Sequence, residues 1–127
     1  MNGAEYQDDP SIPDAAVVWR RVPPEWVKFE DGVLRPSTGA FDDSSDGSPM
    51  SAVANRQDRG PESIVARYPG CGVIGMSAKS LRDLGFALVR APDDEDEDHI
   101  YVAGKKTKGA RKRMKYGCWW LIQPAVT

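Results

Sequence analysis

Apolar residues in this chain come in short runs that are separated by turn-forming residues. Runs of this length, rich in aliphatic and aromatic residues and bounded by Gly, Pro, Asn or Asp, are typical of short strands. We expect strands at residues 15–22, 71–76, 86–90 and 99–103, an edge strand at 50–54, and a closing apolar strand that ends at Ile122. In a strand, Trp119 and Trp120 would point to opposite faces, one into the core and one toward the surface or a partner.

Turn and capping residues complete the predicted elements. Asp31-Gly32 separates two short apolar segments and predicts the tight turn of a hairpin. Helices are expected over residues 61–68, with Pro61 at the first position, over 78–84, capped by Ser77, and after Thr107. The resulting fold class is α+β: a mixed, mainly antiparallel sheet of five to seven short strands with two or three short helices, the last one basic.

The composition predicts one domain. The chain has 127 residues and 40% hydrophobic content, which is enough for a single core and too little for two. Residues 1–14 are polar and acidic and predict a loose N-terminal arm, so residues 15–127 would form the compact domain. No apolar run approaches the roughly 20 residues of a membrane span, and the first residues lack a signal-peptide pattern. We therefore expect a cytoplasmic protein with no membrane partner.

The helix expected after Thr107 is the main functional candidate. Its apolar face would contain Ala110, Met114, Gly117, Cys118 and Leu121, whereas Lys108, Arg111, Lys112 and Lys115 would share the opposite face. Cations at the start of a helix are unfavourable unless an anion is close, because the helix dipole is already positive there. The predicted site for nucleic acid or another anion consists of Lys105, Lys106, Lys108, Arg111, Lys112, Arg113 and Lys115.

A second charge run leaves the interpretation of this helix open. Residues 93–98 are all acidic, and the net charge of the chain is -2, so the whole chain has no basic excess. The acidic run would pair with the basic helix, or both runs would be solvated surface. A third hypothesis is that the acidic segment occupies the basic site until a polyanion displaces it. The sequence also leaves open whether residues 39–60 form an ordered loop.

Familiar cofactor and metal motifs are incomplete in this chain. Gly70 to Gly75 matches GxGxxG, but we interpret it as a turn followed by a strand, because no strand precedes it and no helix follows directly. Gly104-Lys105 lacks the earlier glycine of a phosphate-binding loop, since that position is His99. Cys71 and Cys118 are far apart and the chain has a single histidine, so reduced, buried thiols are expected instead of a zinc site. We expect no cofactor and no metal.

The sequence therefore favours a small non-catalytic accessory or regulatory protein of bacterial or phage type. Its basic C-terminal helix would bind an anionic partner, either DNA or RNA. One alternative is a protein-protein interaction module, an inhibitor or complex subunit, that uses the charge runs and an exposed tryptophan. A second alternative is a small nucleotide-directed enzyme, in which Arg35, Ser37, His99 and Lys105 would surround one pocket and His99 would act as acid or base.

Overall fold

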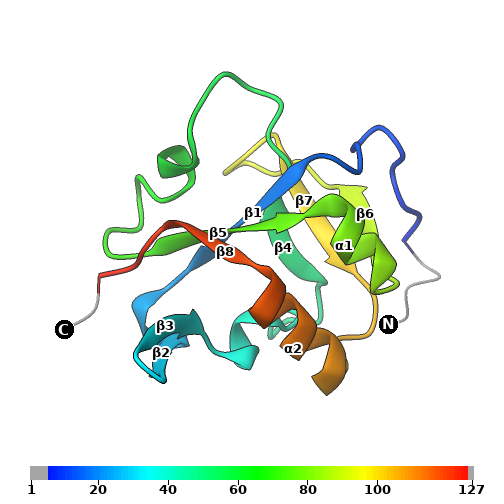
Figure 1. Ribbon diagram of the computed structural model, residues 1–127. Coiled ribbons are helices and arrows are strands. Elements are labelled where there is room, and N and C mark those ends of the chain that lie inside the picture. The colour runs from blue at the N-terminus through cyan, green and yellow to red at the C-terminus, as the bar shows by residue number, and fades with distance from the viewer. Residues whose placement is uncertain (1–5, 126–127) are drawn as a thin grey trace.

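A six-stranded antiparallel sheet forms the centre of the computed structural model, which describes residues 6–125 (Figure 1). The strand order is β6-β7-β4-β1-β5-β8. The strands are β1 (Val17–Val22), β4 (Met50–Val53), β5 (Gly72–Ser77), β6 (Ala87–Arg90), β7 (His99–Ala103) and β8 (Trp119–Ile122). A separate hairpin consists of β2 (Val27–Glu30) and β3 (Val33–Pro36).

Within the described residues, two α-helices and three short 3₁₀ helices accompany the strands. They are α1 (Ala78–Asp83), α2 (Lys108–Gly117), η2 (Pro24–Trp26), η3 (Thr38–Phe41) and η4 (Pro61–Ile64). Both predicted caps are present, since the hydroxyls of Ser77 and Thr107 each accept a backbone N–H hydrogen bond at 3.1 Å. The predicted α+β class is confirmed. Within residues 6–125, no helix is long and apolar enough to span a membrane.

Three predicted elements differ from the structure. The strand expected at the sheet edge, β4, lies in the middle, because its backbone pairs with β7 along four residues and with β1 at Val53. Residues 61–68 form only the four-residue η4, since Ile64-Val65 is β-branched and Pro69-Gly70 ends the segment. Helix α2 ends at Gly117, so Leu121 belongs to β8 and not to the helix.

The core lies between one face of the sheet and the two helices. Every second residue of β1, Val18 and Val22 among them, packs against this core with Phe41 of η3 and Met114 of α2. The opposite, outer face of the sheet contains Trp19, Arg21, Ser51, Val53 and His99. The predicted alternation in β8 is confirmed: Trp120 packs on the core and donates a hydrogen bond to the Leu34 carbonyl, whereas Trp119 is exposed.

Residues 6–14, part of the expected arm, lie against β6 and α1. Asp9 donates its backbone N–H to the Leu88 carbonyl at 2.8 Å, and the Asp8 carboxylate accepts from the Leu88 N–H at 2.9 Å. Ile12 is fully buried in the core. Arg82 of α1 forms ion pairs with both Asp8 and Asp14. The rest of the expected arm, residues 1–5, lies outside the described residues.

The hairpin turn has the predicted geometry and allows a direct test. Asp31 and Gly32 both have positive φ angles, 52° and 78°, which identifies a type I′ turn. We expect Gly32→Ala to lower the free energy of unfolding by about 1 kcal/mol, because an L-residue is disfavoured in this conformation.

Gly109 in α2 provides the control for this substitution. No atom lies within 4 Å of a Cβ built at either glycine, but Gly109 has an ordinary helical backbone. Gly109→Ala should therefore raise the free energy of unfolding by about 0.5 kcal/mol. Urea denaturation of both variants measures the two changes in the free energy of unfolding. If both changes had the same sign, the backbone explanation would be contradicted.

The sheet opens between β1 and β4. These strands share a single register pair, Trp19 with Val53, whereas β1 pairs with β5 along six residues. Beyond Trp19 the described residues of the two strands form no further backbone pairs, and the guanidinium of Arg20 hydrogen-bonds to β4 instead. Its Nη1 donates to the Ser51 carbonyl at 2.5 Å and its Nε to the Ala40 carbonyl at 2.7 Å. The opening therefore places a cationic side chain within the sheet.

Candidate functional site

The seven basic residues of the predicted site fall into two groups. Three form ion pairs with carboxylates from other elements: Lys106 with Asp43 at 2.8 Å, Arg111 with Asp42 at 3.3 Å, and Lys115 with Glu30. The other four have no ion pair within residues 6–125, and all of them are exposed: Lys105, Lys108, Lys112 and Arg113. The fold thus uses three of the cations internally and leaves four facing solvent.

Lys106 stabilises the turn that leads into α2. Its side chain is only 2% exposed, and its ammonium donates to the carbonyls of Val102 and Gly104, both at 2.8 Å. Burial lowers the pKa of Lys106, and the hydrogen bond to Asp43 partly opposes that effect. The ammonium is therefore engaged inside the fold, although the sequence placed it at an open helix N-terminus.

Lys115 lies on the covered side of α2, so its expected place on the exposed face is wrong. Its exposed fraction is 4%, and its ammonium contacts the Glu30 carboxylate of the β2–β3 hairpin. The Lys115 hydrogen bond holds the pKa of Glu30 below its usual range, with a further contribution from the Tyr116 hydroxyl. Glu30 of the hairpin is 85 positions from Lys115 in sequence, so helical periodicity could not reveal that the hairpin covers this side of α2.

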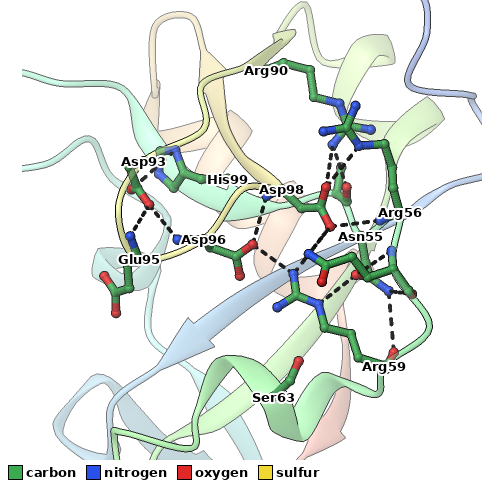
Figure 2. A network of polar contacts seen from close by, with 12 residues as sticks. Asn55, Arg56, Arg59, Ser63, Arg90, Asp93, Glu95, Asp96, Asp98 and His99 are labelled. Carbon is green, nitrogen blue, oxygen red and sulfur yellow. Dashed lines mark hydrogen bonds and ion pairs between the residues drawn. The ribbon is translucent and has the colours of Figure 1, made fainter.

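The acidic run at residues 93–98 pairs with arginines of the 55–59 segment and not with α2 (Figure 2). Arg59 contacts Asp96 at 2.9 Å and Asp98 at 3.5 Å, and Arg56 contacts Asp98 at 3.0 Å. The hypothesis that this run pairs with the basic helix is therefore wrong. The displacement hypothesis fails with it, because the acidic segment does not occupy the basic site.

Asp98 is the centre of this network. The residue is 1% exposed and accepts hydrogen bonds from the Arg56 backbone at 3.1 Å and from the Gln57 amide at 2.9 Å. Burial would raise the pKa of the Asp98 carboxyl, but the hydrogen bonds from Arg56 and Gln57 outweigh it and keep the pKa below its usual value. The carboxylate thus stays ionised and ties the 55–59 segment to the start of β7.

A cavity of about 420 Å³ adjoins the opening between β1 and β4. Residues of both strands line it, among them Trp19, Arg20 and Ser51. Residues from two further segments, 59–68 and 93–96, also line the cavity. His99 also lines this cavity, and its Nδ1 lies 2.7 Å from the Ala91 carbonyl.

The four residues of the proposed enzyme pocket do not line a common cavity. His99 borders the 420 Å³ cavity, whereas Arg35 lies at the contact between the hairpin and α2, 5.0 Å from the Tyr116 ring. Lys105 follows β7 at the end opposite to His99, and Ser37 precedes η3. Within the described residues, this constellation therefore provides no nucleophile and base pair.

The GxGxxG match and the two cysteines have structural explanations. Gly72 and Gly75 lie within β5, so the GxGxxG match is a turn followed by a strand, as interpreted. Cys71 and Cys118 are free and half-buried, and burial raises the pKa of Cys118 to about 11. Among residues 6–125, no group of three or more His, Cys, Asp or Glu side chains is arranged to hold a metal ion.

Sequence reasoning missed the residues around the cavity, Arg20 above all. A signal was present, because Arg20 has the same parity in its strand as the apolar Val18 and Val22. That parity places a charged residue on the core side. Comparisons with protein-family models, curated proteins and solved structures gave no match.

Proposed function

We propose that this protein is a non-catalytic accessory or regulatory protein that binds nucleic acid through the exposed face of α2. One observation supports the proposal: Lys105, Lys108, Lys112 and Arg113 have no ion pair within residues 6–125, although their neighbours do. The nearby carboxylates Asp42, Asp43 and Glu30 are already engaged by other cations.

The spacing of these cations suits a polyanion. Lys108 and Lys112 are one helical turn apart, and like charges at this spacing repel each other weakly. A phosphate backbone relieves the repulsion and releases its own counterions as it binds. Tyr116 continues the same row one turn further on, with 58% of its surface exposed.

The affinity should depend steeply on salt. Neutralising four phosphates gives a log-log slope of about -3.6 for duplex DNA. With a net charge of -2, the rest of the protein adds no general attraction. Binding should therefore be measurable at low salt and disappear near physiological ionic strength unless the sequence or structure of the nucleic acid adds contacts.

Fluorescence anisotropy with labelled duplex and single-stranded DNA and RNA across a salt series tests the proposal. We expect the native chain to bind, and Lys108→Gln with Lys112→Gln to reduce the salt slope by roughly two units. Neither side chain has a described partner, so the double variant should fold normally.

The matched control is the double variant Lys28→Gln with Lys79→Gln. It removes the same charge from two exposed lysines that lie in β2 and α1 and already contact Glu30 and Asp83. Its salt slope should equal that of the native chain. Absence of binding at low salt, or equal losses in both double variants, would contradict binding through α2 and favour a protein partner instead.

A further inference from the structure

Arg20 is a buried cation without a carboxylate partner. The residue is 9% exposed, and within residues 6–125 it forms no ion pair. Its two hydrogen bonds go to neutral carbonyls and use two of the five N–H groups of a guanidinium. Burial lowers the pKa of Arg20 to about 10, and repulsion by Arg21 adds to that effect. A buried charge normally has a counter-ion, so this arrangement is incomplete.

The nearest carboxylates are already used. Asp42 and Asp43 raise the pKa of Arg20 slightly, but Asp42 pairs with Arg111 and Asp43 with Lys106. In the described part of the chain, three cations therefore share two carboxylates around η3. Within that part, Arg20, at the opening of the sheet, is the cation left without a carboxylate partner.

Arg20 is one of the residues that line the 420 Å³ cavity, whose volume lies in the range typical of small-molecule sites. Trp19, Trp26 and Tyr68 supply aromatic walls, and the Arg20 guanidinium lies 5.5 Å from the Trp26 ring. Aromatic walls with a few polar groups are the usual lining of sites for planar organic ligands.

The acidic residues of the cavity do not neutralise Arg20. Glu95 accepts a hydrogen bond from the Tyr68 hydroxyl and lies 3.6 Å from Arg21, and Asp96 pairs with Arg59. Asp93 lies 3.9 Å from His99 and accepts backbone hydrogen bonds from residues 95 and 96 (Figure 2). Arg67, which also lines the cavity, is exposed and has no ion pair within residues 6–125.

We propose that this cavity binds a small organic anion with a planar ring, whose anionic group lies against Arg20 and Arg67. The ring would pack against the tryptophan side of the cavity, and the anionic group would supply the missing counter-charge in the opening between β1 and β4. Both phosphate and carboxylate have the required chemistry. The inference is independent of nucleic-acid binding by α2, because the two sites share no residue.

The test is a titration of the native protein with adenosine 5′-monophosphate and, separately, benzoate. Calorimetry and the intrinsic fluorescence of the tryptophans are the readouts, since Trp19 and Trp26 line the site. Adenosine and inorganic phosphate serve as matched probes that lack the charge or the ring. We expect at least one aromatic anion to bind about tenfold more tightly than either matched probe. The two aromatic anions distinguish phosphate from carboxylate.

Two variants locate the binding. Arg67→Gln changes an exposed residue without a described partner, so it should fold normally and weaken binding about threefold. Arg20→Gln should weaken binding about tenfold, and circular dichroism shows whether it remains folded. If Arg20→Gln unfolds, the affinity of Arg67→Gln alone shows whether the anion binds in this cavity.

Three results would overturn the proposal. The first is that the native chain binds neither aromatic anion. The second is that affinity is unchanged in Arg67→Gln. The third is that binding is lost in the Lys108→Gln and Lys112→Gln double variant but retained in Arg67→Gln, which would place the anion on α2.

Discussion

Replacing Asp98 with asparagine should lower the free energy of unfolding by about 3 kcal/mol at neutral pH. Asparagine keeps the shape of the side chain but removes its charge. Arg56 at 3.0 Å, Arg59 at 3.5 Å and Arg90 at 4.0 Å would then lose their shared counter-ion. Removing the carboxylate is costly because Arg59 and Arg90, whose side chains are 20% and 14% exposed, stay largely desolvated.

Asp94→Asn is the matched control for this prediction. Asp94 belongs to the same acidic run and is exposed, and within residues 6–125 its side chain forms no hydrogen bond or ion pair. Its replacement should change the free energy of unfolding by less than about 0.5 kcal/mol. Urea denaturation at neutral pH compares the two, and equal effects would show that Asp98 contributes only as one charge among six.

The effect of Asp98→Asn should also depend on pH. The pKa of Asp98 is lower in the folded state than in the unfolded state, so its contribution is fully present above the unfolded pKa of about 3.9. That contribution is lost as the pH falls through the folded pKa. The difference in stability between the native chain and Asp98→Asn should therefore shrink below about pH 4. A difference that persists at lower pH would indicate a packing effect instead.

Lys106→Ala should lower the free energy of unfolding by about 3 kcal/mol. The substitution removes the ammonium donor from the carbonyls of Val102 and Gly104 and from the Asp43 carboxylate, which keeps its bond from the Met50 N–H. It also removes the contact between the ammonium and the Phe86 ring, which lies 4.8 Å away.

The adjacent residue provides the comparison. Lys105 is exposed and has no described partner, so Lys105→Ala should change stability by less than about 0.5 kcal/mol. Thermal and urea denaturation of both single variants, with nucleic-acid binding measured in parallel, separates the two roles. A larger stability loss in Lys105→Ala than in Lys106→Ala would contradict the assigned contacts.

Local signals in the sequence predicted most of the elements. Asp31-Gly32 specified the hairpin turn, Ser77 and Thr107 specified helix starts, and the apolar run at residues 99–103 matched β7. Each of these signals depends on residues that are close together in the chain, so it can be recognised from the sequence alone. The central position of β4 was not predictable in this way, because strand order depends on pairing between distant segments.

The candidate site was less predictable than the fold. A lysine in a helix is expected at the surface, yet Lys106 and Lys115 reach carboxylates 63 and 85 positions away. Long side chains combine an apolar stem with a distant charge, so their partners depend on the tertiary fold. The same holds for the acidic run: the sequence left open pairing with the basic helix or solvated surface, whereas Asp98 is buried among arginines from other segments.

The opening between β1 and β4 also divides the sheet mechanically. Backbone ladders resist bending and shear, and β1 is joined to β5 by six register pairs but to β4 by one. The sheet thus consists of two three-stranded halves, β1-β5-β8 and β4-β7-β6, joined by one pair and a shared core. Its stiffness is lowest at this junction, so the amide proton of Ser51, which faces β1, should exchange with solvent faster than those in the middle of β5. A flexing motion there would change the width of the space around Arg20.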